Sequence, residues 1–195
     1  MLNLCDPSLC EFFFGGNTVI VEGDTEYTAF KFILNKHADD PRLNDVHIVR
    51  ARGKATICLV AKILNQFNAR YSILHDSDSP TCVARKKNGE LYNRTNSAWT
   101  VNEAICKSVS LALAARRTRL IAMIPNFEAA FFGEEVSTEK PVNTWQKLQT
   151  NNEACEKVRN LLYCLIDFES KVPSECEEWH DLAQLAVRWD AYAAV

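Results

Sequence analysis

Acidic residues directly follow apolar segments at two places in this sequence of 195 residues. The segment TVIV is followed by Glu22, with Glu26 about one helical turn further on, and the segment YSILH is followed by Asp76 and Asp78. Strand ends lie at protein surfaces, where acids also serve solubility. Carboxylates about 5 Å apart at an effective dielectric constant near 20 repel each other by roughly 3 kcal/mol, so a cluster of them persists only if it is protonated or bridged by a cation.

The ion that such a cluster favours is Mg²⁺ or Mn²⁺, because all-oxygen ligand sets are hard. A zinc pattern is absent from the sequence, since its eight cysteines form no C-x-x-C pair and have no histidines at zinc spacing. Glu128, which follows the apolar segment RLIAMI, is a further candidate ligand. Asp-x-Asp alone is weak support, because acids are also common at helix starts. Its combination with a glutamate at another strand end is more specific.

Four apolar segments predict the strands that would position these acids: residues 18–21, 46–51, 71–75 and 119–124. Segments of helical periodicity lie between them. Strands that alternate with helices pair in parallel through right-handed crossovers, and the carboxyl ends of neighbouring strands then meet at one crevice. We therefore expect the five acids to lie together at one edge of an α/β sheet.

Polar stretches separate the remaining predicted elements. Residues 80–98 predict an exposed loop or a small excursion from the fold. Beyond Pro125 the pattern is mainly helical. Helix starts are predicted from three capping patterns: Thr100 with Glu103, Asn143 with Gln146, and Ser174 with Glu177.

The composition is that of an ordinary globular protein, with 47% hydrophobic and 24% charged residues. This length predicts one large domain or one domain with a helical annex. A formal net charge of −3 argues against binding nucleic acid by bulk basicity, although metal-binding carboxylates would make that count too negative. The cysteine pattern predicts reduced thiols in a cytoplasmic protein, and the sequence shows neither an export signal nor an apolar run of membrane-spanning length.

Three segments together resemble a known family: FFFGGNTVIVEGDTEYTAF, GKATICLVAKIL and YSILHDSDS are similar to the Toprim domain of the overcoming lysogenisation defect (OLD) nucleases. The resemblance covers roughly residues 11–145 and extends more loosely to NFEAAF and Lys140-Pro141. It implies an α/β Toprim (Rossmann-like) fold, with a parallel four-stranded sheet flanked by helices. The implied division is a lead-in (1–16), a Toprim catalytic domain (17–135) and a C-terminal helical extension (136–195).

The resemblance also implies roles for individual residues in a two-metal endonuclease that cleaves DNA. Glu22, Asp76 and Asp78 would hold one ion, while Glu26 and Glu128 would serve a second. Lys140 would neutralise charge on the phosphate in the transition state. These ions would be Mg²⁺ or Mn²⁺. In this family an ATPase of the ATP-binding-cassette (ABC) type usually precedes the nuclease, so the resemblance implies phage defence with an ATPase partner, and a homodimer is a further assembly to consider.

Basic residues outside this motif set are candidates for nucleic-acid binding. They are Lys54, Arg85, Lys86, Lys87 and Arg94. Lys54 would contact a DNA phosphate or simply solvate the first turn of a helix, and the other four would form a strand-binding loop or serve solubility. His75 is typical of a buried strand residue rather than a catalytic one.

Alternative functions remain open from the residues alone. The chain would be a catalytically silent binding or regulatory module, a Toprim protein of strand passage or primer synthesis, or a phospho-acceptor receiver, although the acids after the first strand match a receiver poorly. No G-x-x-x-x-G-K-[ST] motif is present, so no ATPase is assigned. We expect a stand-alone Toprim protein, the separated half of a two-gene system, or a fragment of a longer chain.

Overall fold

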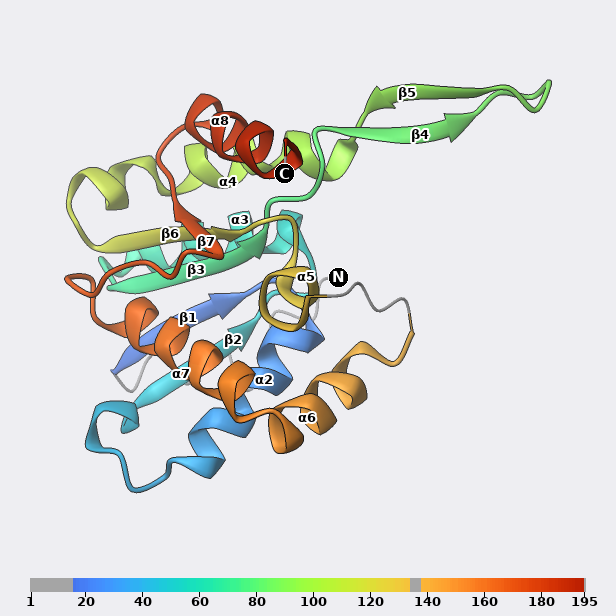
Figure 1. The fold of residues 1–195 in the computed structure, drawn as a ribbon. Coiled ribbons are helices and arrows are strands. Elements are labelled where there is room, and N and C mark those ends of the chain that lie inside the picture. The colour runs from blue at the N-terminus through green and yellow to red at the C-terminus, as the bar shows by residue number, and fades with distance from the viewer. Residues whose placement is uncertain (1–15, 134–137, 195) are drawn as a thin grey trace.

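A five-stranded sheet forms the centre of the computed structural model, which describes residues 16–133 and 138–194 (Figure 1). Its strand order is β2-β1-β3-β6-β7. These strands are β1 (Asn17–Val21), β2 (Val46–Arg50), β3 (Tyr71–Asp76), β6 (Thr118–Met123) and β7 (Cys176–Glu178). The first four are parallel, as predicted, and their carboxyl ends lie at the same edge of the sheet.

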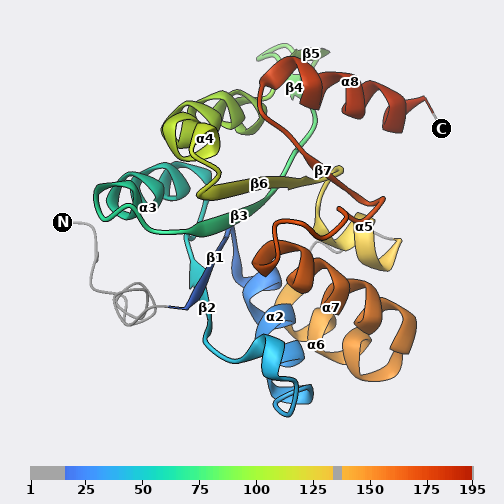
Figure 2. The same cartoon turned by 90° about the vertical axis from the view of Figure 1, so that its left-hand side faces the viewer.

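Helices cover both faces of the sheet (Figure 2). They are α2 (Asp24–Lys36), α3 (Lys54–Gln66), α4 (Ser97–Ala114), α5 (Phe127–Phe132), α6 (Lys140–Thr150), α7 (Asn152–Ile166) and α8 (Leu182–Ala193), with a 3-10 turn at Pro41–Leu43. Successive strand residues point to opposite faces: Val19 packs with Phe30 of α2, whereas Ile20 packs with Ile57 of α3. Strands between two helical layers are therefore mainly apolar on both faces, which is the pattern that predicted the strands.

The fifth strand, β7, corrects the sequence prediction for this part of the chain. It pairs antiparallel with β6, with Met123 opposite Cys176. The capping pattern of Ser174 with Glu177 predicts a helix start at this place. Instead, α8 begins later, where Asp181 caps it by accepting a hydrogen bond from the backbone N–H of Gln184 (2.8 Å). A strand of three residues is too short to show an alternating pattern, so no periodicity in the sequence indicates it.

Two further helix starts also differ from prediction. Helix α4 begins one turn before Thr100, because the side chain of Asn96 accepts the backbone N–H of Ala98 (3.0 Å). Helix α6 begins at Lys140 rather than at Asn143. Each polar stretch contains several residues able to cap a helix, and packing selects among them.

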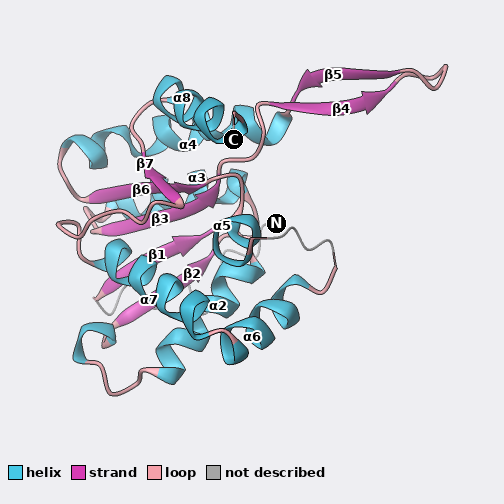
Figure 3. Ribbon diagram, viewed as in Figure 1, coloured by secondary structure: helices cyan, strands magenta, loops and turns pink. Residues whose placement is uncertain are grey.

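An antiparallel hairpin, β4 (Thr81–Arg85) and β5 (Leu91–Thr95), projects from the body between β3 and α4 (Figure 3). We call it the arm. The sequence predicted an exposed excursion here, and the arm is one. Its turn contains Asn88 and Gly89, and Gly89 has a left-handed φ of +88° that glycine adopts without strain.

The C-terminal part of the chain completes the fold rather than standing apart from it. Trp179 is fully buried, and its ring N–H donates to Nε2 of His75 on β3 (3.2 Å). Arg119 on β6 binds Glu178 of β7 and three backbone carbonyls near the end of α7. The predicted domain division at residue 136 stays a prediction. Residues on the C-terminal side of that division supply β7 to the same sheet.

The prediction of a cytoplasmic protein concerns the state of the cysteines and the presence of membrane-spanning helices. The cysteines there are free thiols, namely Cys58, Cys82, Cys106, Cys155, Cys164 and Cys176. Within residues 16–133 and 138–194, no helix has both the length and the apolar character required to cross a bilayer. A cytoplasmic location stays a prediction.

Candidate active site

A cavity of about 380 Å³ lies where β1 and β3 end, between the first turn of α2 and the start of α6. Four of the five predicted ligands line it. The lining residues are Glu22, Gly23, Asp24, Thr25, Glu26, Asp76, Glu128, Glu139, Lys140 and Pro141. Lys140, separated from Asp76 by more than sixty positions in sequence, reaches the same cavity from α6.

Glu22 and Asp76 are fixed by backbone N–H groups. The two residues follow neighbouring parallel strands, and the N–H of Asp76 donates to Oε2 of Glu22 (3.2 Å). The N–H of Phe127, in the first turn of α5, donates to Oδ1 of Asp76 (3.0 Å). Because each carboxylate is held through one oxygen, its orientation is set by the main chain rather than by side-chain packing alone.

Glu26 and Glu128 are almost completely buried, with 3% of each residue exposed. Oε2 of Glu26 accepts the N–H of Gly23 (3.1 Å), and Oε1 of Glu128 accepts the hydroxyl of Thr25 (3.4 Å). Acids are rarely buried to this extent unless they are paired, protonated or bound to a metal.

Burial and mutual repulsion raise the pKa values of the inner acids. Burial is the main cause for Asp76, with repulsion from Glu26 and Glu22 added to it, and its pKa lies well above the usual range. Burial likewise raises the pKa of Glu22, and it raises the pKa of Glu26 to about 7. These acids therefore repel one another unless they are protonated or bound to a cation.

Two lysines pair with Glu128 and Asp78. Nζ of Lys140 lies 3.0 Å from Oε1 of Glu128, and the ammonium of Lys54 contacts the carboxylate of Asp78. Partial burial of Lys140 opposes its charge, but the hydrogen bond and the charge of Glu128 outweigh this and raise the pKa of Lys140. Both lysines are therefore part of the charge balance of this site.

The donor set suits a hard divalent cation, because every candidate ligand is a carboxylate and the inner acids carry uncompensated repulsion. In the described residues, however, no group of three or more His, Cys, Asp or Glu side chains is arranged to hold an ion. Lys54 and Lys140 occupy one oxygen each of Asp78 and Glu128. The chemistry of the residues fits Mg²⁺ or Mn²⁺, and side chains would have to move to complete the ligand set.

The predicted nucleic-acid contacts fall into two groups. Arg85, Lys86, Lys87 and Arg94 are on or next to the strands of the exposed arm. Lys54 is instead buried, with 6% of the residue exposed, and binds Asp78 and Asn102. The ammonium of Lys54 is therefore directed into the protein rather than toward a DNA phosphate at the surface. The sequence did not single out Asn102, because a buried asparagine in an apolar helix has no distinct pattern.

His75 precedes Asp76 but points away from the cavity. It is fully buried, its Nδ1 lies 2.8 Å from the carbonyl oxygen of Asp76, and its Nε2 accepts the Trp179 N–H. Burial, with a smaller contribution from Lys54, lowers the pKa of His75 to about 3. The imidazole is therefore neutral at physiological pH and structural, in line with the sequence interpretation.

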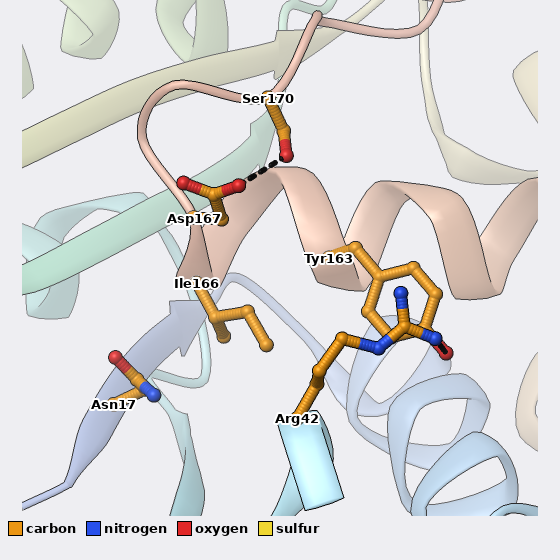
Figure 4. A pocket seen from close by; sticks show the side chains of 6 residues that line it. All are labelled: Asn17, Arg42, Tyr163, Ile166, Asp167 and Ser170. Carbon is orange, nitrogen blue, oxygen red and sulfur yellow. Dashed lines mark hydrogen bonds between the residues drawn. The ribbon is translucent and has the colours of Figure 1, made fainter. Parts of the chain in front are cut away.

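A second cavity of about 360 Å³ lies at the opposite end of β1 (Figure 4). It is lined by Asn17, Arg42, Tyr163, Ile166, Asp167 and Ser170. The Arg42 guanidinium stacks 4.0 Å from the centre of the Tyr163 ring and is paired with Asp40. These groups satisfy one another and include no cluster of acids, so we place the candidate chemistry at the first cavity.

One comparison with known protein families found a match. Residues 13–78 match the family model described as overcoming lysogenization defect protein-like, TOPRIM domain. The matched segment contains Glu22, Glu26, Asp76 and Asp78 and ends before Glu128 and Lys140. No curated protein matches the chain.

Proposed function

We propose, from the premise that residues 13–78 of this chain carry a Toprim domain of the OLD-like family, that the protein is a divalent-metal-dependent endonuclease acting on DNA phosphodiesters. Toprim domains are generally involved in nucleic-acid cleavage or ligation, and the resemblance read from the motifs is confirmed over this segment. The observation that carries the proposal is the convergence of Glu22, Glu26, Asp76 and Glu128 on one cavity beside Lys140.

In this proposal Glu22, Asp76 and Asp78 hold one Mg²⁺ or Mn²⁺, and Glu26 and Glu128 serve a second. Divalent ions supply charge stabilisation to phosphate oxygens and lower the pKa of an attacking water. The protein prepares this chemistry by holding Glu22 and Asp76 through backbone N–H groups. Preorganised ligands do not have to be reoriented during the reaction.

Lys140 is the proposed phosphate contact. Its side chain is 43% exposed at the first turn of α6, so it can leave Glu128 without opening the core. A phosphate oxygen offers an ammonium the same type of charged hydrogen bond that Glu128 provides. We assign Lys140 to neutralising charge on the phosphate during cleavage.

The arm supplies the proposed backbone contacts to DNA. Its basic residues are Arg85, Lys86, Lys87 and Arg94, and Tyr92 is 40% exposed among them. Cations on a projecting hairpin can follow a phosphate backbone that the acidic cavity would otherwise repel. By family resemblance we further propose a role in phage defence with a separate ABC-type ATPase as partner.

Plasmid nicking tests the proposed function. Wild-type protein should relax supercoiled DNA in Mg²⁺ or Mn²⁺ and not in chelator, whereas Asp76→Ala should lose at least about a hundredfold in rate because a ligand of the first ion is missing. Glu103→Ala is the matched control, since Glu103 is an exposed acid of α4 outside the cavity. Equal rates for wild type and Asp76→Ala would refute the nuclease.

The same experiment separates the nuclease from a silent Toprim module. The lysine-held carboxylates of Asp78 and Glu128 favour that second candidate, because they leave no assembled ligand group among the described residues. A silent module would gain thermal stability from Mg²⁺ or Mn²⁺ without nicking DNA in any condition.

Removing the arm charges is expected to weaken DNA binding without affecting the fold. Replacing Arg85, Lys86, Lys87 and Arg94 together by alanine should lower the slope of log affinity against log salt by about 0.9 for each cation that contacts a phosphate. Fluorescence anisotropy with a duplex between 50 and 200 mM salt measures it. The control is Lys62→Ala with Lys107→Ala, which removes exposed cations from α3 and α4. An unchanged slope in the arm variant would rule the arm out as a DNA contact.

A further inference from the structure

The buried ammonium of Lys54 is surrounded by acceptors from two separate segments of the chain. It contacts the carboxylate of Asp78, and it lies 2.8 Å from Oδ1 of Asn102 and 3.3 Å from the carbonyl oxygen of Ala98. The carbonyl oxygen of Ser77 is 3.5 Å away. Since an ammonium has three donors, these acceptors saturate it, and withdrawing it toward solvent would leave buried polar groups unpaired.

The ion pair with Lys54 is the contact that fixes the carboxylate of Asp78 in the described part of the chain. Its backbone has a left-handed φ of +59°, a conformation that aspartate tolerates but does not favour. Its side chain is about one-third exposed, and its charge is among those that raise the pKa values of Glu22 and Asp76. Repulsion from those acids would turn an unrestrained carboxylate outward to water.

Both ends of the arm meet at the same ammonium. The outgoing strand leaves after Ser77 and Asp78, and the returning chain enters α4 at Ser97, one residue before Ala98. The N–H of Asn96 donates to the carbonyl oxygen of Pro80 (2.9 Å), which closes the base of the arm. Asn102 links the two sides, because its amide donates to the carbonyl oxygen of Ser77 (2.8 Å) while its Oδ1 accepts from Lys54.

We propose that Lys54 is a positioning residue, which holds the carboxylate of Asp78 in the metal site and fixes the base of the arm beside it. The proposal rests on the proposed metal-dependent function for its first part. It gives Lys54 a role inside the protein, in place of a contact with DNA. One oxygen of Asp78 is taken by Lys54, so Asp78 offers the other to an ion.

Mn²⁺ binding to Lys54→Met, followed by the electron paramagnetic resonance of free Mn²⁺, distinguishes positioning from simple charge. Losing a positive charge beside the site would by Coulomb's law tighten cation binding. Losing a residue that orients a ligand should weaken it, by about 10- to 100-fold. We expect weaker binding. Lys62→Met, an exposed position on the same helix, should match wild type.

Hydrogen exchange gives a second measurement that does not need a metal. In Lys54→Met the amides of Asp78 and Asn96, bound to Pro125 and Pro80, should exchange faster than in wild type, because the shared anchor is lost. Asn102→Ala, which keeps the charge of Lys54, should shift both measurements in the same direction by less. It replaces Lys54→Met if that variant does not fold.

The outcomes separate failure of this inference from failure of the proposed function. Unchanged or tighter Mn²⁺ binding with unchanged exchange in Lys54→Met would overturn the positioning role. Unchanged Mn²⁺ binding and exchange with weaker duplex binding would overturn it too, in favour of a direct phosphate contact. If wild-type protein bound no Mn²⁺, the proposed function would fail, and faster exchange in the variant would still support Lys54 as the anchor of Asp78 and the arm.

Discussion

Glu26→Gln is expected to stabilise the metal-free protein at pH 8 by about 3 kcal/mol and to slow plasmid nicking by at least about a hundredfold. Burial, with repulsion from Glu22 and Glu128, raises the pKa of Glu26 from 4.5 to about 7. The folded protein therefore holds this proton more tightly than the unfolded chain does. The stability that this provides is complete below pH 4.5 and is lost as the pH rises through 7.

Glutamine imitates the protonated acid at every pH, and its carbonyl oxygen can still accept the N–H of Gly23. Urea unfolding in chelator at pH 4.5 and pH 8 measures the effect: the two proteins should be equally stable at the lower pH and differ at the higher one. The low pKa of His75 also lowers stability below pH 6.5, but it does so in both proteins and cancels. Glu103→Gln, on the exposed face of α4, is the control.

A variant less stable than wild type at pH 8 would show that Glu26 is not under electrostatic strain. Full nicking activity in Glu26→Gln would remove Glu26 from the proposed second metal position. The expected combination, greater stability with less activity, is the signature of a residue placed for ligand binding rather than for folding.

Arg119→Met should lower the free energy of unfolding by about 3–5 kcal/mol, because it leaves a buried network without its donor. The Arg119 guanidinium binds Glu178 through two nitrogens (2.9 and 2.8 Å). It also donates to the backbone carbonyls of Cys164, Asp167 and Ser170. Methionine fills similar space but satisfies none of these acceptors.

Thermal unfolding measures this change, and a fall in Tm of about 6 °C or more is expected for a chain of this size. Arg116→Met, three residues before Arg119 and exposed, should change Tm little. A small effect of Arg119→Met would mean that β7 and the end of α7 are held mainly by apolar packing around Trp179.

The positions of the main proposed ligands were predictable because they depend on short-range patterns. Apolar β-branched runs indicated β1 and β3, and residues that directly follow parallel strands must meet at one edge of the sheet. Glu22 and Asp76 were therefore correctly expected to be neighbours. The approach of Glu26 followed from helical spacing, since it lies one turn into the helix after Glu22.

The partners of these acids were not predictable, because they depend on which distant segments pack together. Lys54 looked like a surface cation after a glycine, yet the return of α4 beside α3 buries it against Asp78 and Asn102. The arm was visible only as a polar stretch, and β7 was too short to leave an alternating pattern.

Sequence alone thus determined the parallel α/β core and the set of acids at its edge, since both follow from local periodicity and chain direction. Only the tertiary structure decided how those charges are balanced: Lys140 on Glu128 and Lys54 on Asp78. The physical reason is that charge pairing and desolvation depend on distance and burial in three dimensions, which the local sequence around Lys54 or Lys140 does not contain.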